Sequence, residues 1–138
     1  MLAAEVDSEH DEDDAIALND IVVQKQETGR LLDFETWIDG VYVNTHGGDG
    51  LVVATPTGST AYALSGGGPI LHPDMNAFVL VPICPHTLSD RPLVVRGNRT
   101  IEIKVREREA ARSSISCDGR HLCDLIPEKT LRIRRSEH

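Results

Sequence analysis

The chain has 138 residues, of which 40% are hydrophobic and 26% are charged, and its formal net charge is −8. This length fits one domain and is too short for two independent ones, and the composition is typical of a chain that folds around a core. No apolar run approaches the roughly 20 residues that cross a bilayer, and the acidic N-terminus lacks the basic and apolar segments of a secretory signal. The sequence therefore predicts no membrane segment and a cytoplasmic location.

The acidic excess is concentrated near the N-terminus. Eight of the 22 acidic residues precede Lys25, the first basic residue, whereas twelve of the 14 basic residues lie between Arg91 and Arg135. In residues 101–106 charged and apolar residues alternate, which indicates the solvated face of half-buried strands. No aromatic residue follows Phe78, so the basic region offers no stacking platform for nucleic-acid bases. We therefore expect no nucleic-acid partner.

In chain order, the first segment is residues 1–15, which is acidic and expected to be mobile. In residues 32–38, Leu32, Phe34, Thr36 and Ile38 share one face, and Asp33, Glu35 and Trp37 share the other, which is strand periodicity. Asp39-Gly40 supplies the positive φ angles of a tight turn, and residues 41–43 return as the partner strand. Further strands are predicted at residues 20–24, 51–55, 78–83, 93–95, 100–106, 114–117, 121–125 and 130–134, with a second tight turn at Asp118-Gly119. Short strands at intervals of about ten residues favour a mainly β fold, a β-sandwich of antiparallel sheets over residues 16–138.

One short helix is predicted, after the segment Thr-Pro-Thr-Gly-Ser-Thr-Ala-Tyr at residues 55–62. The Ser and Thr side chains of residues 57–60 can cap the exposed amides, residues 61–64 can continue as the helix, and Gly66-Gly67-Gly68-Pro69 ends it. Seven of the eleven glycines lie between Gly47 and Gly68. Such a stretch can bring backbone amides close to a nucleotide phosphate, or it can be a structural turn, and the residues alone leave both readings open. It is not a P-loop, because no lysine lies between Lys25 and Lys104.

The three cysteines are Cys84, Cys117 and Cys123. An odd number without an export signal argues against a disulfide framework, so the thiols are predicted to be reduced. Cys117, His121 and Cys123 are conceivable zinc ligands, but no Cys-x-x-Cys pair is present and a fourth ligand would have to come from elsewhere. Buried thiols are the favoured interpretation, and no metal site is predicted.

Several motifs carry a family resemblance. Asp49-Gly-Leu-Val-Val-Ala-Thr-Pro-Thr-Gly-Ser-Thr-Ala-Tyr62 is followed by Gly67-Gly-Pro-Ile70 and by Pro82-Ile-Cys-Pro-His-Thr-Leu-Ser-Asp-Arg-Pro92. These segments closely resemble the C-terminal domain of the NAD kinase family. Ala17-Leu-Asn-Asp20 resembles the Ala-Leu-Asn-Glu element of that family, and Ile115-Ser-Cys-Asp-Gly119 resembles its later hairpin. The resemblance runs from about residue 16 to about residue 135, with the motifs in the family's order.

The resemblance implies a β-sandwich domain that binds NAD and helps to form the subunit interface of a homo-oligomer. The enzyme would use ATP or polyphosphate, with a divalent cation such as Mg²⁺, to phosphorylate the 2′-hydroxyl of the adenosine ribose and give NADP. Asp49 would meet the nicotinamide end across the subunit interface, and residues 60–65 would lie around the adenosine half. The substrate-binding residues implied are Asn19, Asp20, Asp49, Thr60, Ala61, Tyr62 and Ser65, with Arg30, Gly47 and Arg120 at positions where residue identity varies among members. Asp20 is one methylene shorter than the family's glutamate.

In the family, the catalytic aspartate belongs to a Gly-Gly-Asp-Gly-Thr motif in a preceding α/β domain. Gly47-Gly48-Asp49-Gly50 imitates that motif, but Leu51 follows it and it occupies the place of the binding aspartate, so Asp49 is not assigned as the base. The resemblance thus implies a chain without a catalytic residue, inactive alone, that works with its own N-terminal α/β domain. The alternative is a non-catalytic regulatory module that binds NAD(P) or another nucleotide.

Overall fold

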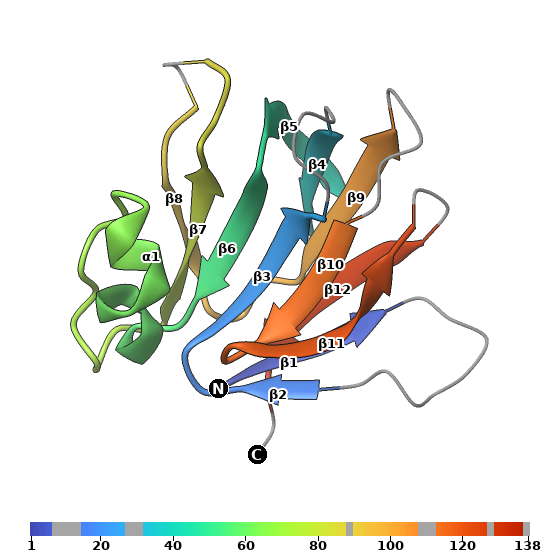
Figure 1. Ribbon diagram of the computed structural model, residues 1–138. Helices are drawn as coiled ribbons and strands as arrows, with labels where there is room; N and C mark the ends of the chain where they lie inside the picture. Colours follow the sequence, from blue (N-terminus) through green and yellow to red (C-terminus); the bar gives the residue numbers. More distant parts are fainter. Residues whose placement is uncertain (7–14, 27–31, 88–89, 108–112, 127–128, 137–138) are drawn as a thin grey trace.

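The residues that the structure describes form a sandwich of two six-stranded sheets, in which neighbouring strands are antiparallel (Figure 1). This computed structural model describes residues 1–6, 15–26, 32–87, 90–107, 113–126 and 129–136. The predicted fold class, an antiparallel β-sandwich with one short helix after residues 55–62, is confirmed.

The first sheet has the order β2-β1-β12-β9-β4-β5 and the second has the order β11-β10-β3-β6-β7-β8. The first contains β2 (Ala15–Ala17), β1 (Leu2–Val6), β12 (Thr130–Arg135), β9 (Ile101–Glu107), β4 (Leu32–Ile38) and β5 (Val41–Gly48). The second contains β11 (Arg120–Leu125), β10 (Ser113–Cys117), β3 (Asp20–Lys25), β6 (Gly50–Ala54), β7 (Ala77–Ile83) and β8 (Leu93–Arg96). The 3₁₀ turn η2 (Thr57–Thr60) and the helix α1 (Tyr62–Ser65) follow β6.

The structure differs at the N-terminus from the mobile segment expected over residues 1–15. Leu2–Val6 is strand β1, which pairs with β12 on one side and with β2 on the other. The side chain of Leu2 is fully buried in the core. This pairing joins residues 2 and 135, and such a long-range contact has no local sequence signature. Residues 7–14 lie outside the described residues.

Both predicted Asp-Gly turns are present with the same geometry. Asp39 and Gly40 have φ of 51° and 80°, and Asp118 and Gly119 have φ of 50° and 82°. Two consecutive positive φ angles match the right-handed twist of the flanking strands, which is why Asp-Gly is favoured there. The first turn joins β4 to β5, and the second joins β10 to β11.

Strand alternation divides the apolar side chains between two clusters. The main core lies between the sheets and includes Ile21, Val23, Phe34, Ile103 and Leu131. A second cluster lies on the opposite face of the second sheet, where Val22, Val52 and Val81 pack with Ala63 of α1. Strands β6 and β7 of the second sheet are therefore buried on both faces, which explains their near-continuous hydrophobic runs. No helix among the described residues is long and apolar enough to cross a membrane.

Candidate functional site

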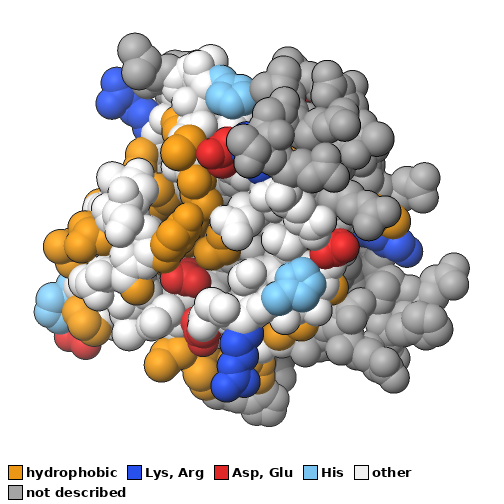
Figure 2. All heavy atoms as spheres, in the orientation of Figure 1, with side chains coloured by type: hydrophobic (Ala, Val, Ile, Leu, Met, Phe, Trp, Pro, Cys, Tyr) orange, Lys and Arg blue, Asp and Glu red, His pale blue; other side chains and the backbone are white. Residues whose placement is uncertain are grey.

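A cleft of about 330 Å³ lies on the outer face of the second sheet, beside α1. Figure 2 shows hydrophobic side chains gathered over β6 and β7 on this face, with acidic side chains below them. The volume is near the lower end of the range for small-molecule sites. The residues that line the cleft are Asp20, Val22, Gln24, Ala61, Tyr62, Ser116 and Gly119.

The floor of the cleft follows from the two-residue period of a strand. Asp20, Val22 and Gln24 of β3 point to the same face of the sheet. Ser116 of β10 lies directly opposite Val22 in the antiparallel register. Tyr62 forms a wall from the start of α1, and its side chain remains 44% exposed. The cleft thus combines a carboxylate, an amide, two hydroxyls and an aromatic ring.

Asp20 is the buried charged group of this cleft, with only 5% of its surface exposed. Burial raises the pKa of its carboxyl, and the nearby negative charge of Asp118 raises it further. Burial of an ionised carboxylate is unfavourable unless partners compensate it. A buried carboxylate at the floor of a cleft is therefore a candidate binding group rather than a stabilising one.

The Gly-rich segment is held against residues 18–19 by backbone contacts. The Thr55 hydroxyl donates to the carbonyl of Leu18 at 2.7 Å, and the Thr55 backbone N–H donates to the carbonyl of Asn19 at 2.9 Å. At Gly58, a Cβ would lie 1.8 Å from the Asn19 carbonyl oxygen. Only glycine fits this close approach, so Gly58 has a structural role that places α1 beside the start of β3.

The hydroxyls and amides of this segment are largely satisfied internally. The N–H of Gly58 donates to the Thr55 hydroxyl at 3.0 Å, whereas Ser59 and Thr60 donate back to the carbonyls of Pro56 and Thr57. Neither η2 nor α1 has a side-chain cap at its N-cap residue. The predicted capping by residues within the helix is therefore wrong. Thr55, which precedes the helical turns, provides the hydrogen bond instead.

Asp49 lies at the opposite end of β3. Its carboxylate pairs with the ammonium group of Lys25 at 2.8 Å, and its backbone N–H donates to the carbonyl of Ile83 at 3.0 Å. Gly47 is next to it, where a Cβ would lie 3.3 Å from both an Asp33 carboxylate oxygen and the His86 ring. Asp49 and Gly47 therefore lie together at the end of β3 that is away from Asp20, and neither lines the cleft.

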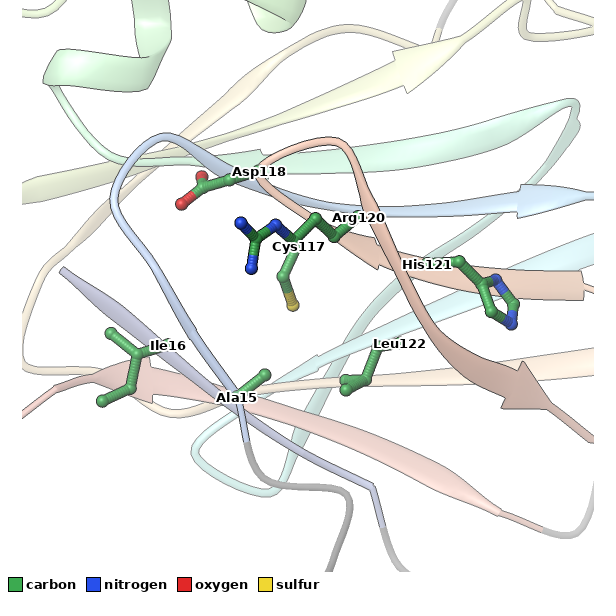
Figure 3. Close-up of a pocket in the computed structure, with 7 residues that line it drawn as sticks. All are labelled: Ala15, Ile16, Cys117, Asp118, Arg120, His121 and Leu122. Atoms are coloured by element: carbon green, nitrogen blue, oxygen red, sulfur yellow. The ribbon is translucent and has the colours of Figure 1, made fainter.

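A second hollow, of about 490 Å³, lies on the other side of the Asp118-Gly119 turn. Figure 3 shows the Arg120 guanidinium extending over the Cys117 thiol, while the His121 ring points away. Burial raises the pKa of Cys117 to about 11, with further contributions from the charges of Asp118, Cys123 and Asp20. A thiol with so high a pKa stays protonated at neutral pH. The described residues contain no group of three or more His, Cys, Asp or Glu placed to hold a metal ion.

Comparison with known proteins identifies the family. A family model described as the ATP-NAD kinase C-terminal domain matches residues 18–138. The chain belongs to this family. The match includes every site residue predicted from the sequence, and the predicted resemblance to the C-terminal domain of NAD kinases is confirmed.

Curated relatives of this NAD kinase-family domain are considerably longer. The NAD kinase of Acinetobacter baylyi is 52% identical over 122 residues, which are 88% of this chain and 39% of the relative. The NAD kinase of Pseudomonas putida is 46% identical over 136 residues, which are 98% of this chain and 46% of the relative. The chain thus spans between about two fifths and one half of the length of these relatives.

Two solved structures share the fold of this NAD kinase-family domain. Yeast NADH kinase, solved in complex with NADH, is 33% identical with a TM-score of 0.88, and the match covers 98% of this chain and 39% of that chain. The NAD kinase of Archaeoglobus fulgidus, solved in complex with ATP, is 32% identical with a TM-score of 0.79, and the match covers 99% and 51% of the two chains.

The predicted site residues of this NAD kinase-family domain are divided among several places. Asp20, Ala61 and Tyr62 line the cleft. Asn19 precedes Asp20 in the chain but does not line the cleft. The exposed Thr60 and Ser65 lie on η2 and α1 and do not line it either. Asp49 and Gly47 lie at the far end of β3, Arg120 lines the second hollow, and Arg30 is outside the described residues.

Four cleft residues were not predicted from the sequence: Val22, Gln24, Ser116 and Gly119. For Val22 and Gln24 a signal was available, because they share a face with Asp20 on a predicted strand. Ser116 and Gly119 belong to a hairpin about 100 residues away. Only the pairing of β10 with β3 brings them to the cleft.

Proposed function

We propose that this domain forms the dinucleotide site of an NAD kinase, an enzyme that phosphorylates the 2′-hydroxyl of the adenosine ribose of NAD to give NADP. One observation carries the proposal: Asp20 lines the same cleft as Ala61 and Tyr62, about 40 residues later in the chain. Relatives named NAD kinase, and a similar structure in complex with NADH, support the choice of ligand.

The chemistry of the cleft suits a nucleoside. The Asp20 carboxylate accepts hydrogen bonds from hydroxyl or amide groups, and Gln24 and Ser116 offer both donors and acceptors. Tyr62 offers an exposed ring face for stacking and a hydroxyl group. In this proposal Asn19 and residues 60–65 support the adenosine half of the ligand. Arg120 lines the second hollow, on the other side of the Asp118-Gly119 turn, and its contact with the ligand stays a prediction.

Calorimetric titration of the chain with NAD tests the binding proposal. Tyr62→Ala and Asp20→Asn should each weaken NAD binding about tenfold or more. The first removes a stacking surface, and the second removes a charged acceptor. Tyr42→Ala is the matched control for Tyr62, because Tyr42 is the other tyrosine, is similarly exposed at 49%, and lies on β5 of the other sheet. Equal losses from Tyr42→Ala and Tyr62→Ala would contradict the assignment of the cleft.

We further propose that phosphoryl transfer requires a preceding α/β domain, which supplies the base and most of the site for ATP or polyphosphate and its divalent cation. NADP formation from NAD, ATP and Mg²⁺ by the folded chain should then be absent. Loss of the base and of donor positioning lowers rates by several powers of ten. Turnover that Asp49→Asn abolishes would instead make Asp49 a candidate base. NAD binding that persists without turnover when the chain is joined to such a domain would favour the regulatory module.

Asp49 has a different place in the proposal. It lies outside the cleft of its own chain, so we propose that it meets the nicotinamide end of a ligand bound by a second subunit of a homo-oligomer. Its ion pair with Lys25 is part-exposed, with 38% of the Asp49 side chain accessible. The carboxylate therefore retains free acceptor sites for a ligand amide.

A further inference from the structure

The turn between β10 and β11 makes an unusual contact with the segment that enters the cleft. The Asp118 carboxylate accepts hydrogen bonds from three consecutive backbone N–H groups: Leu18 at 2.7 Å, Asn19 at 2.7 Å and Asp20 at 3.1 Å. The N–H of Asp118 donates in return to the carbonyl of Asp20 at 3.0 Å. One side chain thus fixes the backbone that carries both Asn19 and Asp20, from about 100 residues away.

The same segment is held on its other side by Thr55. Thr55 donates to the carbonyls of Leu18 and Asn19, which are acceptors, whereas Asp118 accepts from the amides, which are donors. The backbone between β2 and β3 is therefore paired on both sides where the chain passes from one sheet to the other. Thr55 places this backbone against the Gly-rich segment, and Asp118 places it against the floor of the cleft.

The carboxylate of Asp118 is suited to this contact. Burial acts to raise its pKa, but the hydrogen bonds from Leu18, Asn19 and Asp20 outweigh that effect and lower it. Asp118 is thus a charged acceptor under ordinary conditions, and charge-assisted hydrogen bonds are stronger than neutral ones. Gly119, the next residue of the turn, lines the cleft itself.

We propose that Asp118 is a positioning residue of the dinucleotide site, whose carboxylate sets the backbone of residues 18–20 and thereby the placement of Asn19 and Asp20 at the cleft. This inference rests on the proposed function for its ligand, and on the three hydrogen bonds for its mechanism. A purely structural turn would affect stability without a selective effect on binding.

The other Asp-Gly turn provides a matched control. Asp39 has the same backbone conformation as Asp118, accepts the N–H of Thr100 at 2.9 Å and pairs with Arg99 at 2.8 Å. It does not line the cleft. Asp118→Asn and Asp39→Asn each keep a residue that tolerates positive φ, and each removes a charged acceptor. The two variants therefore differ mainly in which contacts are altered: those with residues 18–20 for Asp118, and those with Thr100 and Arg99 for Asp39.

The experiment is NAD titration calorimetry of the wild type and both variants, together with NMR of the Leu18, Asn19 and Asp20 amides over a pH series. We expect Asp118→Asn to weaken NAD binding about tenfold, and Asp39→Asn to bind as the wild type does. In the wild type the three amide resonances should shift as Asp118 is protonated, and in Asp118→Asn this shift should be lost.

The possible failures are distinguishable. Equal NAD affinity in Asp118→Asn and Asp39→Asn would overturn the positioning role even if the amide shifts are present. Amides that do not respond to acid would overturn the contact itself. A folded wild-type chain that responds at these amides but does not bind NAD would overturn the proposed function, and with it the ligand named here.

Discussion

The two ends of strand β3 differ in how many elements of the chain surround them. At the Asp20 end, the cleft is assembled from β3, β10, the turn after it and α1, and the backbone is held by Asp118 and Thr55. At the Asp49 end, five residue steps along β3, or about 16 Å away, the Asp49 carboxylate forms an ion pair with Lys25. The first end thus has a formed cleft, whereas at the second end the Asp49 carboxylate is part-exposed beside Lys25.

This difference shows how a strand separates residues that are neighbours in a motif. Asp49 and Thr55 flank β6, which runs beside β3 and carries them to opposite ends of the second sheet. The motif that is continuous from residue 49 to residue 62 therefore extends from one end of the second sheet to the other. A ligand bound in the cleft can contact the Asp49 end of its own chain only if the ligand is long. Otherwise, a second chain has to supply the Asp49 that contacts it.

The largest contrast is expected from alanine substitutions of one glycine at each end. Gly58→Ala places a Cβ 1.8 Å from the Asn19 carbonyl oxygen, so the backbone has to move. The free energy of unfolding should fall by about 1–3 kcal/mol or more. At Gly47 the nearest atoms are side-chain atoms of Asp33 and His86 at 3.3 Å, which can shift slightly. Gly47→Ala should therefore lower the free energy of unfolding much less, as measured by urea denaturation. Equal losses of stability in the two variants would contradict the difference between the two ends of β3.

A mixing experiment tests whether the Asp49 end serves a second subunit. In the proposed homo-oligomer, Asp20→Asn and Asp49→Asn should each weaken NAD binding. Refolding the two variants together should restore about one quarter of the sites in a two-fold dimer, because one site of each mixed pair receives both intact residues. A mixture of Asp20→Asn and Tyr62→Ala, which both alter the cleft, should restore none. Recovery in both mixtures would argue against a shared site.

The smallest effect concerns pH. Burial and the charge of Asp118 disfavour the ionised form of Asp20, so its pKa lies above the usual 3.8. Ionised Asp20 then opposes folding at neutral pH, and Asp20→Asn should slightly stabilise the fold there while weakening NAD binding. Asp118 has the opposite sign: its lowered pKa gives stability that is present above pH 3.8 and is lost as the pH falls through the folded-state value.

NMR titration of the carboxyl carbons measures both pKa values directly. In Asp118→Asn the midpoint of the Asp20 titration should fall toward its usual value, because the neighbouring charge is gone. An unchanged Asp20 midpoint in that variant would show that burial alone raises the pKa. The lowered pKa of Asp39, which follows first from its hydrogen bond with Thr100 and then from Arg99, provides an internal reference away from the cleft.

The sequence by itself determined the two Asp-Gly turns, the family and the described strands other than β1 and β2. Strand alternation, turn residues and local motifs depend on neighbours in the chain, and the second sheet formed where these patterns predicted strands. Contiguous motifs singled out Asp20, Ala61 and Tyr62, which the structure places in one cleft, and their binding role stays a prediction. Capping of the helix by residues 57–60 was predicted wrongly, because the Gly58 N–H donates instead to the hydroxyl of Thr55, which precedes the helical turn.

Only the tertiary structure decided which of these residues meet. Leu2–Val6 became a strand because β12 lies beside it, and Ser116 entered the cleft because β10 pairs with β3. Asp118 reached the amides of residues 18–20 across about 100 residues of sequence. Such contacts depend on the register between distant strands. That register follows from burying the apolar face of every strand at once, rather than from any local pattern.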